Sequence, residues 1–124
     1  MKKIFTAILL ILLIGCAGQR LMSLEGMPSG VPTETVKIKG DNCKWIPDLV
    51  RVKKGSHVIL EVESVDWDYN FRLVGYDLRF KIPKGQKVTG EFYASQTGEF
   101  EYGCYIEKGF HYFWGGMVGK LIVE

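Results

Sequence analysis

Short segments of alternating apolar and polar residues, each ended by a glycine or proline turn, most limit how this chain can fold. In the segment 57–63, for example, Val58, Leu60 and Val62 fall on one face of an extended chain. The segments with this pattern are 36–39, 49–53, 57–63, 69–74, 86–93, 99–104 and 120–123. Most of them start roughly 8 to 13 residues after the one before, and none of this region has a sustained helical period. The pattern predicts an all-β domain, an antiparallel sandwich or barrel.

The N-terminus has the composition of a targeting signal. Lys2 and Lys3 precede an apolar run that is much shorter than the roughly 20 residues a transmembrane helix needs. The run ends at Gly15 and Cys16, and it resembles the lipobox of bacterial lipoproteins, in which the cysteine becomes the first mature residue and carries lipid. We therefore predict a signal peptide over 1–15 and a lipid anchor at Cys16. The predicted location is the bacterial cell envelope, with the protein held on a membrane and facing the periplasm or the exterior.

The rest of the chain divides into a linker and one domain. Residues 16–34 are rich in glycine, proline, serine and threonine and have no apolar period, so we expect a flexible tether. Residues 35–124 then form a single domain with one core, because the segment is too short for a second.

Charge and motifs exclude several function classes. The 16 basic and 14 acidic residues nearly cancel, and no basic run interleaves with aromatics, so a nucleic-acid partner is not predicted. The chain has no nucleophile elbow, phosphate-binding glycine loop or spaced carboxylate pair, so we do not predict an enzyme. With Cys16 lipidated, Cys43 and Cys104 remain, and two cysteines in an oxidising compartment commonly form a disulfide.

The C-terminal segment 104–124 carries the most chemistry. It contains a thiol at Cys104, an imidazole at His111 and a thioether at Met117, followed by a short apolar strand. Thiolate, imidazole and weak thioether are the ligand types of a soft, redox-active copper site. One further ligand from elsewhere in the fold would complete such a site.

Four blocks of the sequence, in this order, resemble the cupredoxins, the small Greek-key copper proteins that include plastocyanin and azurin. The blocks are Trp45-Ile46-Pro47 with the valine-rich segment 50–55, the segment 64–71, the segment 98–104, and the segment 117–124 after His111. The resemblance implies a cupredoxin-like Greek-key β-sandwich or barrel. In loop detail the chain is similar to the copper domain of cytochrome c oxidase subunit II, but Lys108 stands in the place of that domain's second cysteine. This difference disfavours a dinuclear copper centre.

The same resemblance implies a ligand set. Cys104 matches the thiolate ligand, His111 the C-terminal imidazole and Met117 the axial thioether. The first ligand of the family is a histidine, and its place is taken here by Tyr69. Cys43, which lies near the copper end of the fold in this comparison, and Tyr69 are therefore the two candidates to complete the site.

Two functions remain open at this stage. In the first, the protein binds one copper ion for electron transfer or copper handling and meets a redox or copper-delivery protein. Completion by Cys43 would favour Cu(I) and copper carriage, whereas completion by Tyr69 would favour Cu(II). In the second, Cys43 and Cys104 form a disulfide, and a metal-free module acts in binding or in assembly of a respiratory or copper-enzyme complex.

Overall fold

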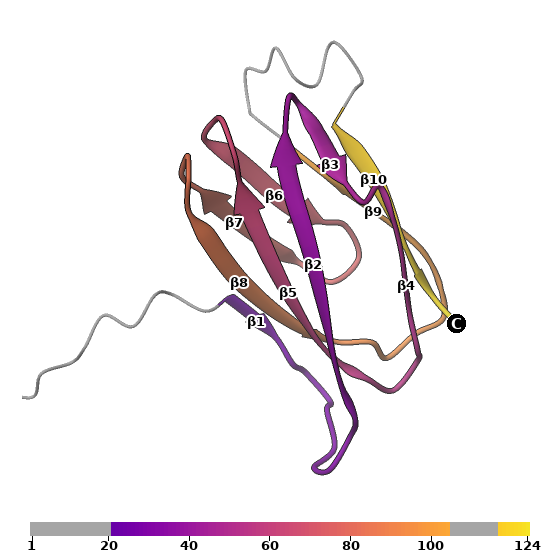
Figure 1. The fold of residues 1–124 in the computed structure, drawn as a ribbon. Coiled ribbons are helices and arrows are strands. Elements are labelled where there is room, and N and C mark those ends of the chain that lie inside the picture. The colour runs from indigo at the N-terminus through magenta and orange to yellow at the C-terminus, as the bar shows by residue number, and fades with distance from the viewer. Residues whose placement is uncertain (1–20, 105–116) are drawn as a thin grey trace, which may run out of the picture.

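The protein is a sandwich of two β-sheets. The computed structural model describes residues 21–104 and 117–124, and these contain ten strands and no helix (Figure 1). The strands are β1 (Leu21–Ser23), β2 (Thr33–Asp41), β3 (Lys44–Ile46), β4 (Leu49–Val52), β5 (His57–Ser64), β6 (Tyr69–Leu73), β7 (Leu78–Ile82), β8 (Lys87–Tyr93), β9 (Gly98–Gly103) and β10 (Val118–Val123). The predicted all-β sandwich is confirmed.

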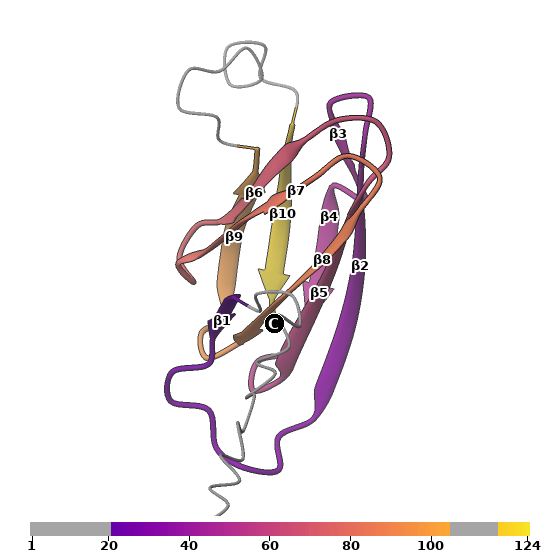
Figure 2. The ribbon, with the colours of Figure 1, turned by 90° about the vertical axis from the view of Figure 1, so that its left-hand side faces the viewer.

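The two sheets have five strands each and are both mixed. One has the order β1-β8-β5-β2-β3 and the other β4-β10-β9-β6-β7. Figure 2 shows the two layers from the side, with β9 and β10 in one and β2 and β5 in the other. The expectation of antiparallel strands is wrong for three pairs, since β1–β8, β2–β5 and β4–β10 are parallel. A parallel pair cannot be joined by a tight turn, and the chain crosses between the sheets to make these pairs.

The core lies between the sheets and is filled by every second residue of the strands. In β7, for instance, Leu78, Phe80 and Ile82 are buried while Arg79 and Lys81 are exposed. Burying one such large apolar side chain stabilises the fold by roughly 1.5–3 kcal/mol.

Aromatic rings form the centre of this core. Phe71 lies 5.1 Å from Phe80, 5.6 Å from Tyr102 and 5.4 Å from Trp45, measured between ring centroids. Trp45 in turn contacts Tyr69, with centroids 5.8 Å apart. The cluster fixes the ends of β3 and β6, which carry residues of the candidate site.

A glycine lets β9 and β10 pack closely. Gly119 lies opposite Tyr102 in the antiparallel pair, and a β-carbon on it would stand 2.3 Å from the tyrosine ring. The ring covers the glycine, and its hydroxyl donates a hydrogen bond of 2.7 Å to the carbonyl oxygen of Pro47. Tyr102 thereby ties the two strands to the segment between β3 and β4.

The N-terminal part of the chain is partly described. Residues 21–23, inside the segment predicted to be a tether, form β1 and pair with β8, and β2 begins at Thr33, just before the predicted domain start at 35. The predicted signal peptide and Cys16 lie outside the described residues. Among the residues that the structure covers, no helix is long and apolar enough to cross a membrane.

Candidate metal centre

Cys104 and Met117 lie side by side at one end of the sandwich. Cys104 follows β9 and Met117 precedes β10, and the N–H of Cys104 donates a hydrogen bond of 3.2 Å to the carbonyl oxygen of Met117. Both side chains are buried. Figure 1 shows the turn between β2 and β3 at the same end. The structure therefore brings together two predicted ligands, whereas the third, His111, lies in the segment 105–116 outside the described residues.

The sulfur of Cys104 accepts a backbone hydrogen bond. The N–H of Asn70 donates to Sγ over 3.4 Å. Burial raises the pKa of the Cys104 thiol, the bond from Asn70 opposes this, and the charge of Cys43 adds to the rise. An N–H aimed at the sulfur stabilises negative charge there, which is the form that binds metal.

Cys43 occupies an unusual backbone position. The two residues between β2 and β3 are Asn42 and Cys43, with φ of 51° and 56°. Positive φ at both positions is characteristic of a type I′ turn, where Asn-Gly is the preferred pair. Asparagine tolerates this conformation, but a residue with an ordinary β-carbon in the second position is strained by roughly 1–2 kcal/mol. Strain of this kind is concentrated at functional sites, where the side chain is needed in that place.

Asp66 and Tyr69 hold this turn. Oδ2 of Asp66 accepts a hydrogen bond of 3.0 Å from the N–H of Asn42, and Oδ1 accepts one of 2.6 Å from the hydroxyl of Tyr69. The tyrosine oxygen accepts a third bond, of 3.2 Å, from the N–H of Cys43. The hydroxyl of Tyr69 is thus engaged both as donor and as acceptor.

The electrostatics of this network keep the phenol neutral. Burial, and next the hydrogen bond to Asp66, raise the pKa of Tyr69. The same hydrogen bond lowers the pKa of Asp66. The carboxylate therefore carries the negative charge and the tyrosine keeps its proton, whereas metal binding by Tyr69 would need a phenolate.

Cys43 lies close enough to Tyr69 and Cys104 to affect the pKa values of both. Its charge raises the pKa of Tyr69 and that of Cys104. Both Cys43 and Cys104 are thiols in the structure, so the disulfide of the alternative, metal-free function is not seen. Among residues 21–104 and 117–124, no three His, Cys, Asp or Glu side chains form a metal-binding group. A site here would depend on thioether sulfur and on the predicted ligand His111 as well as on the thiols.

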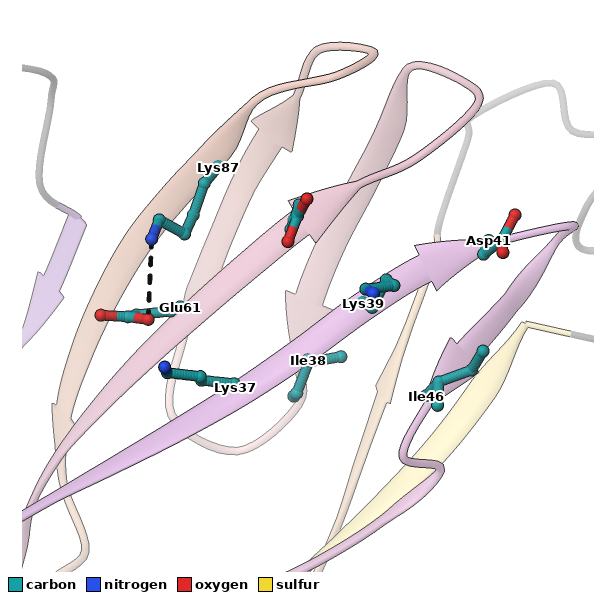
Figure 3. Close-up of a pocket in the computed structure, with 8 residues that line it drawn as sticks. Lys37, Ile38, Lys39, Asp41, Ile46, Glu61 and Lys87 are labelled. Carbon is teal, nitrogen blue, oxygen red and sulfur yellow. Dashed lines mark ion pairs between the residues drawn. The ribbon is translucent and has the colours of Figure 1, made fainter.

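A separate hollow of about 530 Å³ lies on the outer face of the first sheet (Figure 3). Its lining residues come from β2, β3, β5 and β8: Lys37, Ile38, Lys39, Asp41, Ile46, Glu61, Glu63 and Lys87. Lys87 pairs with Glu61 across 3.8 Å, and Lys39 faces Glu63 in the strand register. Charges of both signs alternate across these strands, which is a common way to stabilise an exposed sheet face. The hollow contains none of the predicted ligands.

Comparison with known proteins finds similarity in structure alone. No family model matches the sequence, and no curated protein does. The structure is similar to auracyanin A, a blue copper protein from the bacterium Chloroflexus aurantiacus, at 17% identity and a TM-score of 0.62, covering 74% of this chain and 99% of that one. It is also similar to the metal-binding domain, with Cu(I), of the Cu(I)-exporting ATPase CopA of Streptococcus pneumoniae. Here the identity is 12% and the TM-score 0.62, over 86% of this chain and 99% of that one.

A third similarity is to a chain of a heme-copper terminal oxidase dimer. The identity is 17% and the TM-score 0.63, and the match covers 77% of this chain and 66% of that one, so this chain matches just under two thirds of its length. At these identities the likeness concerns the fold. The chain has a cupredoxin-like fold.

Proposed function

We propose that the protein binds one Cu(I) ion and handles copper, as a carrier or store, at the bacterial cell envelope. The observation that best supports this is the strained position of Cys43, which is hydrogen-bonded to Tyr69, while the next residue of β6, Asn70, is hydrogen-bonded to Cys104. In this proposal Cys43, Cys104 and Met117 bind the ion, together with His111, which stays a prediction.

The donor set suits the reduced ion. Two thiolates and a thioether are soft ligands, and soft sulfur ligands select Cu(I). Tyr69 is the poorer candidate for the remaining position, because its hydroxyl donates to Asp66 and its pKa is raised. We therefore assign the position to Cys43. A blue electron-transfer centre needs two histidines and a cysteine in a trigonal set, and the residue at the first of those places is Tyr69.

The chain's own groups would prepare the site. Copper, when bound, supplies a soft cation that can be passed on or can cycle between two oxidation states. The N–H of Asn70 stabilises charge on the sulfur of Cys104. Trp45, Tyr69 and Met117 are almost wholly buried, so they keep water from that end of the core.

Anchoring and partner complete the proposal. We infer that Cys16 carries lipid and holds the domain on a membrane, facing the periplasm or the exterior. We also infer that a redox or copper-delivery protein exchanges electrons or copper with the site. The fold shared with a Cu(I)-exporting ATPase domain and a terminal oxidase chain supports a role in copper traffic. No catalytic activity forms part of the proposal.

Anaerobic titration of the reduced protein against a chromophoric Cu(I) chelator tests the proposal. We expect one tightly bound Cu(I) per chain, and a loss of affinity of at least about tenfold in Cys43→Ser and in Cys104→Ser. Cys16→Ser is the control, because it removes the cysteine that the proposal assigns to the lipid anchor and not to the site, and its affinity should equal that of the parent. Absence of Cu(I) binding by the parent, or full affinity in both site variants, would contradict the proposal.

A further inference from the structure

We propose that Asp66 is a positioning residue for the copper site, which acts through Tyr69 to hold Cys43 where it can share an ion with Cys104. This inference rests on the proposed function, and it concerns a residue that the ligand assignment leaves out.

Two adjacent residues of β6 connect the two cysteines. The hydroxyl of Tyr69 accepts a hydrogen bond from the N–H of Cys43, and the N–H of Asn70 donates one to Sγ of Cys104. The first two residues of β6 are therefore each hydrogen-bonded to one of the two cysteines. Anything that fixes Tyr69 also fixes the place of Cys43 relative to Cys104.

Asp66 fixes both sides of this contact. One carboxylate oxygen holds the N–H of Asn42 at 3.0 Å, and the other holds the hydroxyl of Tyr69 at 2.6 Å. The turn residue Asn42 and Asp66 are 24 positions apart, so the carboxylate joins the β2–β3 hairpin to the loop between β5 and β6. Hydrogen bonds to an ionised carboxylate are about twice as strong as neutral ones.

Packing leaves the tyrosine ring little freedom to move. Its side chain is almost wholly buried, and it contacts Trp45 with ring centroids 5.8 Å apart. Gly40, at the end of β2, has no β-carbon, and one placed there would stand 2.8 Å from the ring of Tyr69 and 3.0 Å from that of Trp45. The hairpin and the ring are thus in contact on one side and joined by Asp66 on the other. Without the carboxylate, the N–H of Asn42 and the hydroxyl of Tyr69 would lose their acceptor, and the strained turn at Cys43 would be held by fewer bonds.

The chain offers a matched control two residues away. Asp68 lies in the same loop, and its Oδ1 accepts a hydrogen bond of 2.8 Å from the N–H of Lys84, away from the hairpin. Changing Asp66 or Asp68 to asparagine alters charge and volume equally. Only Asp66→Asn replaces one of the two oxygen atoms that accept the hydrogen bonds from Asn42 and Tyr69.

The test compares Asp66→Asn, Tyr69→Phe and Asp68→Asn in the full chain carrying Cys16→Ser, so that two thiols remain. The first measurement is Cu(I) affinity by chelator competition. The second uses no copper: it is capture of a trivalent phenylarsenical, which binds tightly only when two thiols stand close together. We expect Asp66→Asn and Tyr69→Phe each to weaken Cu(I) affinity and capture of the arsenical by at least about tenfold. Asp68→Asn should change neither of these affinities by more than about twofold.

The outcomes separate this inference from the proposed function. If the parent binds no Cu(I) but captures the arsenical in a manner that depends on Asp66, the proposed function fails and the positioning role stands. If the parent binds Cu(I) and both positioning variants match it in the two measurements, the inference is overturned. Far-ultraviolet circular dichroism checks folding, and Tyr69→Phe keeps the buried ring, so it tests the inference even if Asp66→Asn unfolds.

Discussion

The backbone N–H of Asn70 donates a hydrogen bond to Sγ of Cys104 across 3.4 Å, which joins the start of β6 to the end of β9. The two residues are 34 positions apart in sequence. The carbonyl oxygen of Met117 accepts a hydrogen bond from the N–H of Cys104, so the backbones of these two residues are also in contact.

Replacing Cys104 tests this placement. Cys104→Ser should weaken the thiolate-to-copper absorption of the loaded protein, because serine cannot supply a thiolate and only that of Cys43 remains, and the fold should persist because the change is small. The measurement is the difference absorption spectrum, with thermal unfolding as the check on folding. A variant whose band equals that of the parent would exclude Cys104 as a ligand.

The strained turn predicts opposite effects on stability and binding. Cys43→Gly should raise the free energy of unfolding by about 0.5–1 kcal/mol, because glycine adopts positive φ without the cost a β-carbon brings. The same change should lower Cu(I) affinity by at least about tenfold. Asn42→Gly is the control: asparagine already tolerates this conformation, so neither quantity should change much. Urea unfolding and chelator competition measure the two quantities. A Cys43→Gly protein that is stabilised and binds Cu(I) fully would show that Cys43 has no role in the site.

The contact between Gly119 and Tyr102 predicts a packing effect. Gly119→Ala would place a methyl group 2.3 Å from the ring, so the ring must move, and overpacking of this kind costs roughly 1–3 kcal/mol. The movement would also break the hydrogen bond from Tyr102 to Pro47. Urea unfolding of Gly119→Ala, Tyr102→Leu and the double variant gives the coupling between the two sites. We expect the double variant to be less destabilised than the sum of the single ones. Simple additivity would contradict the contact.

Three buried tyrosines predict a loss of stability at alkaline pH. The pKa values of Tyr69, Tyr76 and Tyr102 are all raised above the ordinary 10.0, mainly by burial. As the pH rises past about 10, the unfolded chain loses these protons while the folded one keeps them. Their contribution to stability is therefore intact below about pH 10 and is lost as the pH rises toward their folded pKa values.

Urea unfolding between about pH 8 and pH 12, with tyrosinate absorbance followed in parallel, measures this effect. Tyr102→Phe is the informative variant, since it should reduce the slope of stability against pH above about pH 10. A free energy of unfolding that stays constant over this range would show that the three hydroxyls are not shielded.

Much of the fold could be predicted from alternation. Cys104 shares its phase with Phe100 and Tyr102, as Tyr69 does with Phe71 and Leu73, and both Cys104 and Tyr69 are buried as this alternation indicates. The strand β7 alternates clearly, with Leu78 and Phe80 inward, but no strand was predicted there. The parallel pairs could not be predicted, because alternation within a strand is the same whichever way its neighbour runs.

The candidate site was less accessible to sequence reasoning. Residue types alone indicated Cys104 and Met117, and their proximity follows from one antiparallel pair. The choice between Cys43 and Tyr69 depends on hydrogen bonds between residues 26 positions apart, and Asp66 resembles any residue of a solvated turn. The local signal was present in Asn42 and Cys43, a two-residue turn in which cysteine takes the place of the usual glycine.

X-ray absorption at the copper edge of the Cu(I)-loaded protein tests the central claim most directly. The account predicts a copper shell dominated by sulfur, which loses one sulfur scatterer in Cys43→Ser and one in Cys104→Ser. A shell made only of nitrogen and oxygen, or one that neither substitution changes, would contradict it.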